Sequence, residues 1–119
     1  MMFNDIVKLT LPLKPEYIST IRLTTASLAN RAGFDVEDVE DMVQCSAEAS
    51  NIAFKQDLDD FINIEFQISE NSFNITIGNI NSEDIEEDFE MHMSEMIIMS
   101  LSDRHCFEDG KLIIDKKIR

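Results

Sequence analysis

The chain has 119 residues, 44% of them hydrophobic, and its 24 acidic and 10 basic residues give a formal net charge of -14. This length predicts a single domain over residues 1–119, and the hydrophobic fraction excludes an intrinsically disordered chain. The negative charge would repel phosphate backbones, so we expect no nucleic-acid partner. No apolar run approaches the ~20 residues that cross a bilayer, and no signal sequence is recognisable, so we expect no membrane partner and a cytoplasmic location.

The first half of the chain predicts one strand followed by two helices. Residues 5–11 alternate polar and apolar side chains, as in a strand with one buried face, and two prolines follow. Apolar residues then recur at helical spacing as far as Gly33, which is suited to ending a helix. Asp35 is a suitable N-cap for a second helix that runs to about Gln56. The predicted inner face of this helix consists of Val36, Val39, Val43, Ala47, Ser50 and Phe54.

The second half predicts a hairpin, a helix and a last strand. Residues 61–68 and 73–77 alternate around a turn at 70–72, as in a β-hairpin. A helix is predicted over 91–103, and Lys111–Ile118 is the last strand, after an Asp-Gly turn. The order β-α-α-β-β-α-β predicts an α/β (α+β) two-layer sandwich, with a mixed, mostly antiparallel sheet and helices on one face.

The predicted helix over 91–103 is rich in methionine. Its partly inward residues are predicted to be Met93, Met96, Ile97, Met99, Ser100 and Leu101. Methionines can form an adaptable binding surface, because their side chains are flexible and polarizable. Packing of these methionines in the core is the interpretation we favour.

Glu48 and Asn51 lie one helical turn apart on the second predicted helix, so their side chains share a face. A carboxylate beside an amide is typical of sites that activate a water and hold a magnesium ion. An exposed polar edge of an amphipathic helix explains the same pair and is more common. The small residues around the pair suit the close approach of a ligand or tight packing of the helix on a sheet.

The remaining candidate residues give weaker signals. Arg22 is an isolated cation on the first predicted helix: it is either a solvated surface residue or an anchor for a protein partner, since arginine is enriched at interface hot spots. His92 and His105 have no partners at metal-binding spacing. Cys45 and Cys106 are expected to be free thiols, so we predict no metal site.

Several segments carry a resemblance to a known family. They are residues 11–18, 21–28, 39–49, 97–103 and 110–117. In the same order, they resemble segments of the anti-sigma-factor serine/threonine kinases of Gram-positive bacteria, the RsbW and SpoIIAB type. This family lies within the GHKL superfamily of histidine kinase-like ATPases. The resemblance implies a GHKL-type (Bergerat-like) domain, ATP and magnesium as ligands, and a sigma factor or an anti-sigma antagonist as protein partner.

The resemblance also implies roles for two residues. Arg22 stands where the family has an arginine that contacts both the sigma factor and its antagonist, and Glu48 stands at the catalytic glutamate, the general base. Because the family pairs through sheet edges and first helices, a homodimer is expected.

The nucleotide-binding motifs of the family are altered in this chain. The magnesium-binding asparagine falls at Ile52, so Asn51 is one residue early, a rotation of ~100° about the helix axis. The first glycine box aligns with residues 79–83, where Asn79 replaces the adenine-binding aspartate and both glycines are absent. The second box aligns with residues 92–94, again without glycine. Side chains in place of glycine keep backbone amides away from phosphates.

Two hypotheses follow from this pattern. The first is a regulatory binding protein that has kept the fold and the Arg22 surface, with Glu48 as a vestigial general base and no cofactor. The alternative is a divergent serine/threonine protein kinase that still binds Mg-ATP through Glu48, Asn51 and Asn79. Carboxylates between residues 83 and 88 would repel a triphosphate, which favours the first hypothesis.

Overall fold

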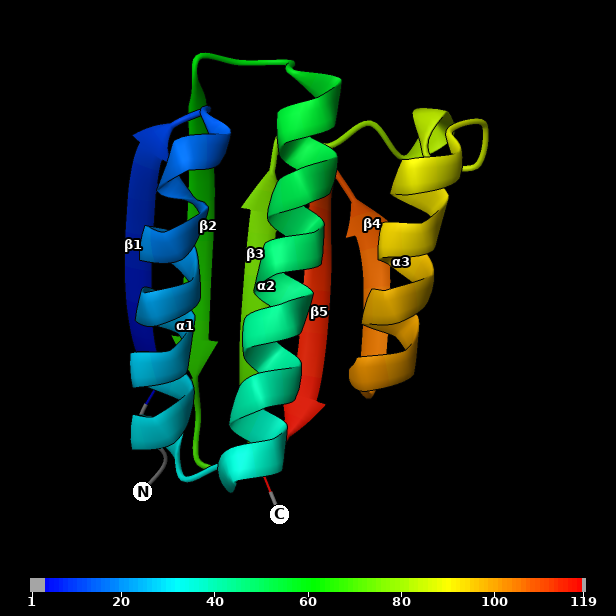
Figure 1. Ribbon diagram of the computed structural model, residues 1–119. Helices are drawn as coiled ribbons and strands as arrows, with labels where there is room; N and C mark the ends of the chain where they lie inside the picture. Colours follow the sequence, from blue (N-terminus) through cyan, green and yellow to red (C-terminus); the bar gives the residue numbers. More distant parts are fainter. Residues whose placement is uncertain (1–3, 119) are drawn as a thin grey trace.

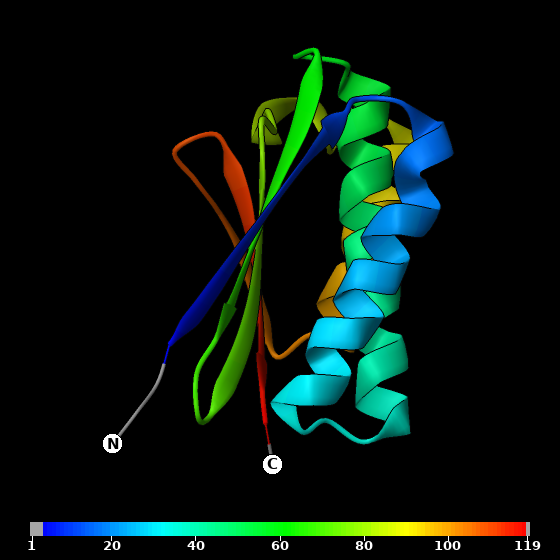
Figure 2. The same ribbon diagram turned by 90° about the vertical axis from the view of Figure 1, so that its left-hand side faces the viewer.

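The computed structural model describes residues 4–118 and has helices on one face of a sheet (Figures 1 and 2). The predicted α+β two-layer architecture is therefore confirmed. Two short 3₁₀ helices, Pro15–Tyr17 and Ser82–Asp84, precede the first and third α-helices. The elements are β1 (Asp5–Pro12), α1 (Ile18–Ala32), α2 (Val36–Gln56), β2 (Phe61–Ile68), β3 (Ser72–Gly78), α3 (Phe89–Leu101), β4 (Arg104–Glu108) and β5 (Lys111–Lys117). No helix within residues 4–118 combines the length and apolarity needed to cross a bilayer.

The sheet has five strands in the order β1-β2-β3-β5-β4. Every pairing among the described residues is antiparallel, so the expectation of a mixed sheet is wrong. The sequence analysis also missed β4. This strand is short, lies at the sheet edge and lacks a clean alternation of apolar side chains. Asp109 (φ 53°) and Gly110 (φ 74°) both adopt the left-handed conformation, which joins β4 to β5 through a tight hairpin turn.

The core lies between the sheet and the helices. Alternate residues of the three central strands are buried on the helical side, because successive strand side chains point to opposite faces. The Phe73 ring contacts Phe34 edge-on at a centroid distance of 5.8 Å and lies 6.2 Å from Phe66. The fully buried large side chains include Phe66, Phe73, Ile21, Met42, Ile52, Ile62, Ile64, Ile75, Ile77, Ile85, Ile98 and Leu112.

The helix boundaries in the first half follow the predicted signals. Gly33 ends α1 with a left-handed φ of 102°, a conformation that glycine adopts without steric cost. The Asp35 carboxylate accepts a hydrogen bond from the Asp38 backbone N–H at 2.9 Å, which caps the first turn of α2. Both predicted boundaries are confirmed.

The buried face of α2 is wider than predicted. Val36 is 76% exposed, and Val39, Val43 and Phe54 are only partly buried, whereas Ala47 and Ser50 are buried as expected. Since α2 lies between α1 and α3 over the sheet, three of its sides have neighbours (Figure 1). The complete buried set is Met42, Cys45, Ser46, Ala47, Ala49, Ser50, Ile52 and Ala53.

The third helix is shifted and rotated relative to the prediction. It begins at Phe89 because Asp88 caps it: the Asp88 carboxylate accepts from the Met91 backbone N–H at 2.9 Å. Its buried residues are Met91, Ser94 and Ile98. Three of the methionines predicted to face inward are exposed, so the core-packing interpretation is wrong for Met93, Met96 and Met99.

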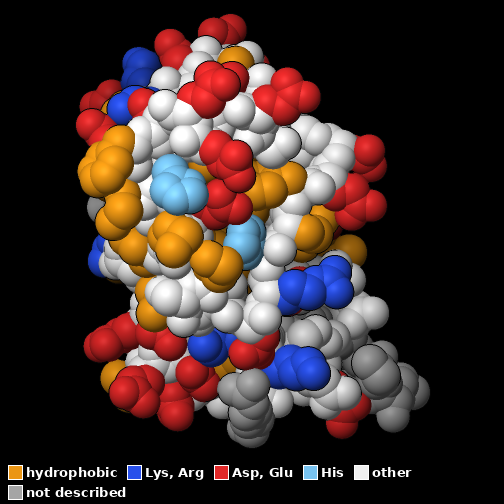
Figure 3. All heavy atoms as spheres, turned by 90° about the vertical axis from the view of Figure 1, so that its right-hand side faces the viewer, with side chains coloured by type: hydrophobic (Ala, Val, Ile, Leu, Met, Phe, Trp, Pro, Cys, Tyr) orange, Lys and Arg blue, Asp and Glu red, His pale blue; other side chains and the backbone are white. Residues whose placement is uncertain are grey.

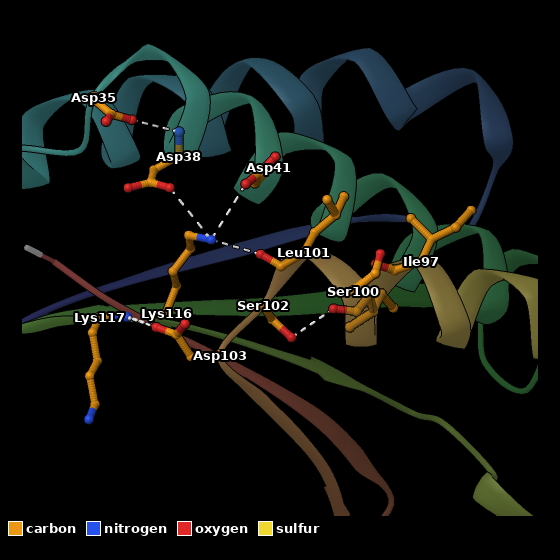
Figure 4. Close-up of polar contacts among 11 residues, drawn as sticks. Asp35, Asp38, Asp41, Ile97, Ser100, Leu101, Ser102, Asp103, Lys116 and Lys117 are labelled. Carbon is orange, nitrogen blue, oxygen red and sulfur yellow. Dashed lines mark hydrogen bonds and ion pairs between the residues drawn. The ribbon is translucent and has the colours of Figure 1, made fainter.

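Lys116 ties the sheet to two helices (Figure 4). Its ammonium group donates to the Leu101 carbonyl oxygen at 2.8 Å, at the C-terminal end of α3. It also lies 3.6 Å from an Asp38 carboxylate oxygen and 3.5 Å from one of Asp41, both on α2. The Lys116 side chain is only 8% exposed, and these acceptors are the partners that a buried cation requires.

Candidate functional site

Glu48 lies in the middle of α2 with both carboxylate oxygens hydrogen-bonded. Oε2 accepts from Gln44 Nε2 at 2.6 Å, one turn earlier on the same helix. Oε1 accepts from Ser94 Oγ at 2.8 Å, which places the carboxylate against α3. The side chain that the sequence singles out as a general base is therefore held in place by a residue 46 positions further along the chain.

Asn51 lines a groove between α2 and α3. The groove has a volume of about 370 Å³ and is lined by Pro15, Asn51, Ile52, Phe54, Lys55, Glu90, Met91 and Ser94. Asn51 is exposed, whereas Ile52 is completely buried in the core. The position at which the family resemblance places a magnesium-binding asparagine thus lies at the bottom of the groove, with no exposed surface. Asn51, one residue earlier, stays in contact with solvent.

Asn79 lies apart from the groove. It follows β3, and its side-chain amide donates to the Asp59 carboxylate at 3.1 Å. It borders a separate hollow of about 220 Å³ on the uncovered face of the sheet, whose lining includes Lys8, Glu65 and Lys111. Asn51 lines the groove between α2 and α3. Glu48 does not line it but accepts a hydrogen bond from Ser94, which does, and Asn79 also lies outside the lining.

The segment between β3 and α3 is packed against the end of α2. Gln56 makes two hydrogen bonds to the backbone of Asn81: its amide nitrogen donates to the carbonyl oxygen at 2.7 Å, and its amide oxygen accepts from the N–H at 2.8 Å. Ile80 and Ile85 are 4% and 1% exposed and belong to the core. Residues 80–85 are therefore held against the rest of the domain by hydrogen bonds to Gln56 and by the burial of two isoleucines.

Lys55 is the one cation among the described residues that line the groove. Its ammonium group lies 3.1 Å from both an Asp88 and a Glu90 carboxylate oxygen. Hydrogen bonds that Lys55 donates to Glu90 and Asp88 raise the pKa of Lys55. The pKa of Asp88 is lowered, first by the Met91 backbone N–H and then, against a desolvation penalty, by Lys55. The cation that would attract a phosphate is already paired with two carboxylates.

Cys45 is buried on α2, one turn before Glu48. Burial raises the pKa of its thiol to about 12, so the thiol stays protonated near neutral pH. Within residues 4–118 no group of three or more metal-binding side chains is present. Cys45 therefore acts as a small apolar residue of the core.

Arg22 lies on the exposed side of α1, with no ion pair or hydrogen bond from its side chain to any part of the chain that the structure describes. Next to it, a shallow hollow of about 530 Å³ separates α1 from the start of α2, with Leu23 71% and Val36 76% exposed along it. This hollow is lined by residues of α1 and α2, and the groove beside Glu48 by residues that include α2 and α3. Figure 1 shows α1 and α3 on opposite sides of α2.

Three residues of the site were not found from the sequence. Lys55 carries a usable signal, because it follows Glu48 by seven residues and so lies on the same helical face. Gln56 and Ser94 carry none: their partners, Asn81 and Glu48, are distant in sequence, and only the packing of α2 against the 80–94 segment brings them together.

The fold and the side chains around Glu48 define an α+β domain whose central helix carries a carboxylate beside a groove. No family model matches the chain. Serine-protein kinase RsbW of Listeria innocua is 38% identical over 88 residues, covering 70% of this chain and 56% of the relative, and the Listeria monocytogenes protein gives the same figures. RsbW of Bacillus cereus is 41% identical over 76 residues, or 60% of this chain and 47% of the relative.

The chain is thus a relative of the RsbW serine-protein kinases, which confirms the family resemblance drawn from the sequence. It spans about half the length of the curated relatives it matches.

Proposed function

We propose that this protein is an anti-sigma-type regulatory binding protein, a pseudokinase of the GHKL type that acts by protein–protein interaction without phosphotransfer. The partner is a sigma factor or an anti-sigma antagonist. The family resemblance implies both this kind of partner and ATP-dependent phosphotransfer; we propose that this chain has kept the partner and lost the phosphotransfer. One observation carries the proposed loss: the segment that would cover a nucleotide is packed against α2, through the two Gln56–Asn81 hydrogen bonds and the buried side chains of Ile80 and Ile85.

The paired groups make nucleotide binding unfavourable. A triphosphate in the groove would have to displace Asp88 and Glu90 from Lys55 and would then face their negative charges. No glycine occurs between Gly78 and Gly110, so no stretch of backbone there is free of Cβ atoms for a close phosphate contact. Millimolar affinity corresponds to only about -4 kcal/mol, so a small number of such defects is sufficient to abolish binding.

The outer side of α1 supports the choice of a protein partner. Arg22 is exposed and unpaired in the described chain, and the neighbouring hollow exposes Leu23 and Val36. An arginine beside exposed apolar side chains is the composition found at interface hot spots.

Calorimetric titration with Mg-ATP tests the absence of nucleotide binding. We expect no heat of binding at millimolar ATP. Binding at tens of micromolar would contradict the proposal and favour the kinase described below. A double variant, Asp88→Asn with Glu90→Gln, removes the competing carboxylates from Lys55 while keeping side chains of similar size. If this variant gains weak ATP binding and the wild type has none, the paired lysine is a cause of the loss.

A pull-down against a candidate sigma factor and a candidate antagonist tests the partner surface. Arg22→Glu should lose the partner, because the charge of the proposed anchor is reversed. Arg31→Glu is the matched control: it makes the same charge change at an exposed arginine near the other end of α1. Equal retention of the partner by wild type and Arg22→Glu would rule out this surface.

A divergent Mg-ATP-dependent serine/threonine protein kinase is the second candidate, favoured by one observation. Asn51, Lys55 and Ser94 line a groove next to Glu48, and the relatives are named kinases. In this candidate the 80–94 segment opens, Lys55 binds phosphate and Asn51 holds magnesium. Phosphorylation of an antagonist by the wild type, lost in Glu48→Gln, would establish it.

Self-association of the chain stays a prediction. The two edges of the sheet are β1 and β4, and Ile6 on β1 is 54% exposed. Sedimentation equilibrium over a range of concentrations measures the dimer directly.

A further inference from the structure

The outer surface of α3 is apolar although it faces solvent. Phe89, Met93, Met96 and Met99 are 78%, 44%, 44% and 50% exposed, and we refer to these four residues as the α3 stripe. Successive members are four, three and three residues apart, which places them along one side of the helix over ~15 Å. Figure 3 shows apolar side chains gathered on this side of the molecule, around the histidines.

The opposite side of α3 faces the core, where Met91 and Ile98 are buried together with Ser94. A helix at a protein surface ordinarily has a polar outer face. The exposed residues of α3 are instead mostly apolar: the four residues of the stripe, with Glu90, His92 and Ser100 among them. Nothing within residues 4–118 covers the α3 stripe. An exposed apolar stripe of this kind marks an interaction surface.

The charges next to the α3 stripe are negative and largely free. The segment directly before the helix exposes Glu83, Asp84, Glu86 and Glu87, and Figure 3 shows acidic side chains bordering the apolar ones. The cations beside α3 are instead neutralised. Lys55 pairs with Asp88 and Glu90, Arg104 pairs with Asp115 at 3.5 Å, and Lys116 is buried with two aspartates.

This charge pattern indicates which kind of partner binds to the α3 stripe. A second copy of the chain would bring the same carboxylates, and a net charge of -14, against those of the first, which is unfavourable. A basic partner is complementary to the border, and an amphipathic helix has the width of the stripe. Methionine and phenylalanine side chains provide contact area, and the methionines adapt their shape to it.

We propose that the α3 stripe docks a basic amphipathic helix of another protein, with the apolar residues of that helix on Phe89 and the methionines and its lysines or arginines against the carboxylates before α3. This surface is separate from the Arg22 side of α1, so the inference goes beyond the proposed function and does not depend on it.

Methionine-methyl NMR with synthetic peptides tests the proposal on the whole chain. The main probe is an amphipathic helix with a leucine face and a lysine face. Two control peptides keep its length: one replaces leucine with serine at the same charge, and the other replaces lysine with glutamate. We expect the main probe to shift the methyl signals of Met93, Met96 and Met99. The signals of buried Met42 and Met91 are internal controls and should move much less.

Binding of the serine peptide as tight as that of the main probe would overturn the proposal, because non-specific attraction to an acidic protein would then explain the result. Unchanged methyl signals with the main probe would overturn it as well. Binding confined to the leucine–lysine peptide supports it.

Two substitutions locate the contact. Met93→Glu with Met96→Glu should weaken the main probe about tenfold or more, because each methionine has roughly half of its surface left to bury. Leu58→Glu is the matched control, an equally drastic change at a residue 50% exposed between α2 and β2, outside both proposed surfaces, and should leave the affinity unchanged. Circular dichroism confirms that each variant is folded. Equal affinity of the double variant and the wild type would contradict the proposal.

Sedimentation of the same double variant tests the other occupant. If the wild type dimerises and the double variant is monomeric, a second copy covers the α3 stripe and the proposal is wrong. Arg22→Glu separates the two proposals: it should bind the main probe like the wild type, whatever its effect in the pull-down.

Discussion

The two flanks of α2 differ in how their charged groups are used. On the α3 side, Lys55 and Glu48 each have two partners within the domain. On the α1 side, Arg22 has none among residues 4–118. A ligand on the first flank must break existing pairs before it gains new ones, whereas a ligand on the second gains its contacts directly. This difference is the reason why we propose the α1 flank as a binding surface, although the residues that look catalytic are on the other flank.

The two flanks of α2 should also differ in whether substitutions affect the stability of the domain or its binding to a partner. Residues on the α3 flank hold the domain together and should show their effects in unfolding experiments. Residues on the α1 flank should show theirs in association experiments alone. Five substitutions test this division between the two flanks, and we give them in order of decreasing expected effect.

Ile52→Asn should have the largest effect. It restores the asparagine that the family resemblance places here, but Ile52 is completely buried, so the change removes apolar packing and buries an amide without a designed partner. We expect a loss of about 3–5 kcal/mol in the free energy of unfolding, measured with urea. Asn51→Ala, at an exposed position on the same helix, should cost less than about 0.5 kcal/mol. A stable Ile52→Asn variant that binds Mg-ATP would overturn the division between the flanks.

Lys116→Ala should follow in size. The substitution leaves the Leu101 carbonyl and two aspartates of α2 without their shared cation. Because the aspartates keep partial contact with water, we expect a loss of about 2–3 kcal/mol. Lys116→Met keeps the apolar stem and should lose less than Lys116→Ala. Equal stability of all three proteins in urea would show that the contacts of Lys116 do not anchor α2 and α3 to the sheet.

Gln56→Ala should loosen the segment over the groove. It removes both hydrogen bonds to the backbone of Asn81, and we expect a cost of about 1 kcal/mol. Amide hydrogen exchange should become faster in residues 80–86 and stay unchanged in the β2–β3 hairpin. Uniform acceleration over the whole domain would mean that this segment opens only by global unfolding.

Asp88→Asn should change the pH dependence of stability. The pKa of Asp88 is lowered in the folded protein, so its charge stabilises the fold above the unfolded-state pKa, and this contribution is lost as the pH falls through the folded-state pKa. Asparagine still accepts the Met91 N–H, so the variant keeps a neutral cap and loses the charge that strengthens both this hydrogen bond and the ion pair with Lys55. The wild type should be the more stable protein near pH 7, and the difference in urea midpoint should shrink as the pH falls below about 4, the usual aspartate value. A difference independent of pH would show that the charge of Asp88 does not contribute to stability.

The stabilising contribution of Lys55 has the opposite pH dependence. Its raised pKa means that its contribution is complete below the unfolded-state value and is lost as the pH rises through the folded-state value. Neutral pH therefore lies inside the window in which both partners are charged. Added salt should weaken the pair, because both side chains are partly exposed.

Arg22→Glu should have no effect on folding. The side chain has no partner in the described chain, so the urea midpoint should correspond to a change of less than about 0.5 kcal/mol. Loss of stability comparable to that of Lys116→Ala would show that Arg22 is part of the scaffold, and its role as an anchor would then have to be abandoned.

The elements of the fold could largely be predicted from the sequence, since their signals are local. The Asp35 cap, the left-handed Gly33 and the alternation over residues 61–68 each depend on neighbours in the chain, and each is confirmed. Errors arose where burial depends on distant packing. Val36 was predicted to be buried and is exposed. β4 was missed because it is a short edge strand without a clean alternation of apolar side chains.

The candidate site was predictable to a smaller extent. The spacing of Glu48 and Asn51 gives a shared helical face, and Asn51 does line the groove on that side. Asn79 was placed in the same site through the family resemblance, but it borders another hollow, on the far face of the sheet. Its direction is set by the path of the chain after β3, which no local pattern encodes.

Hydrophobic periodicity and backbone preferences act over a few residues, so the sequence was sufficient to predict four of the five strands, the three helices and the Asp35 cap. Which polar groups are free depends on tertiary packing. The packing of residues 80–94 on α2 gives Lys55 its partner Asp88 and Glu48 its partner Ser94. The position of α2 between two helices buries Ile52, and the orientation of α3 exposes Met93, Met96 and Met99. Each depends on contacts between elements far apart in the chain.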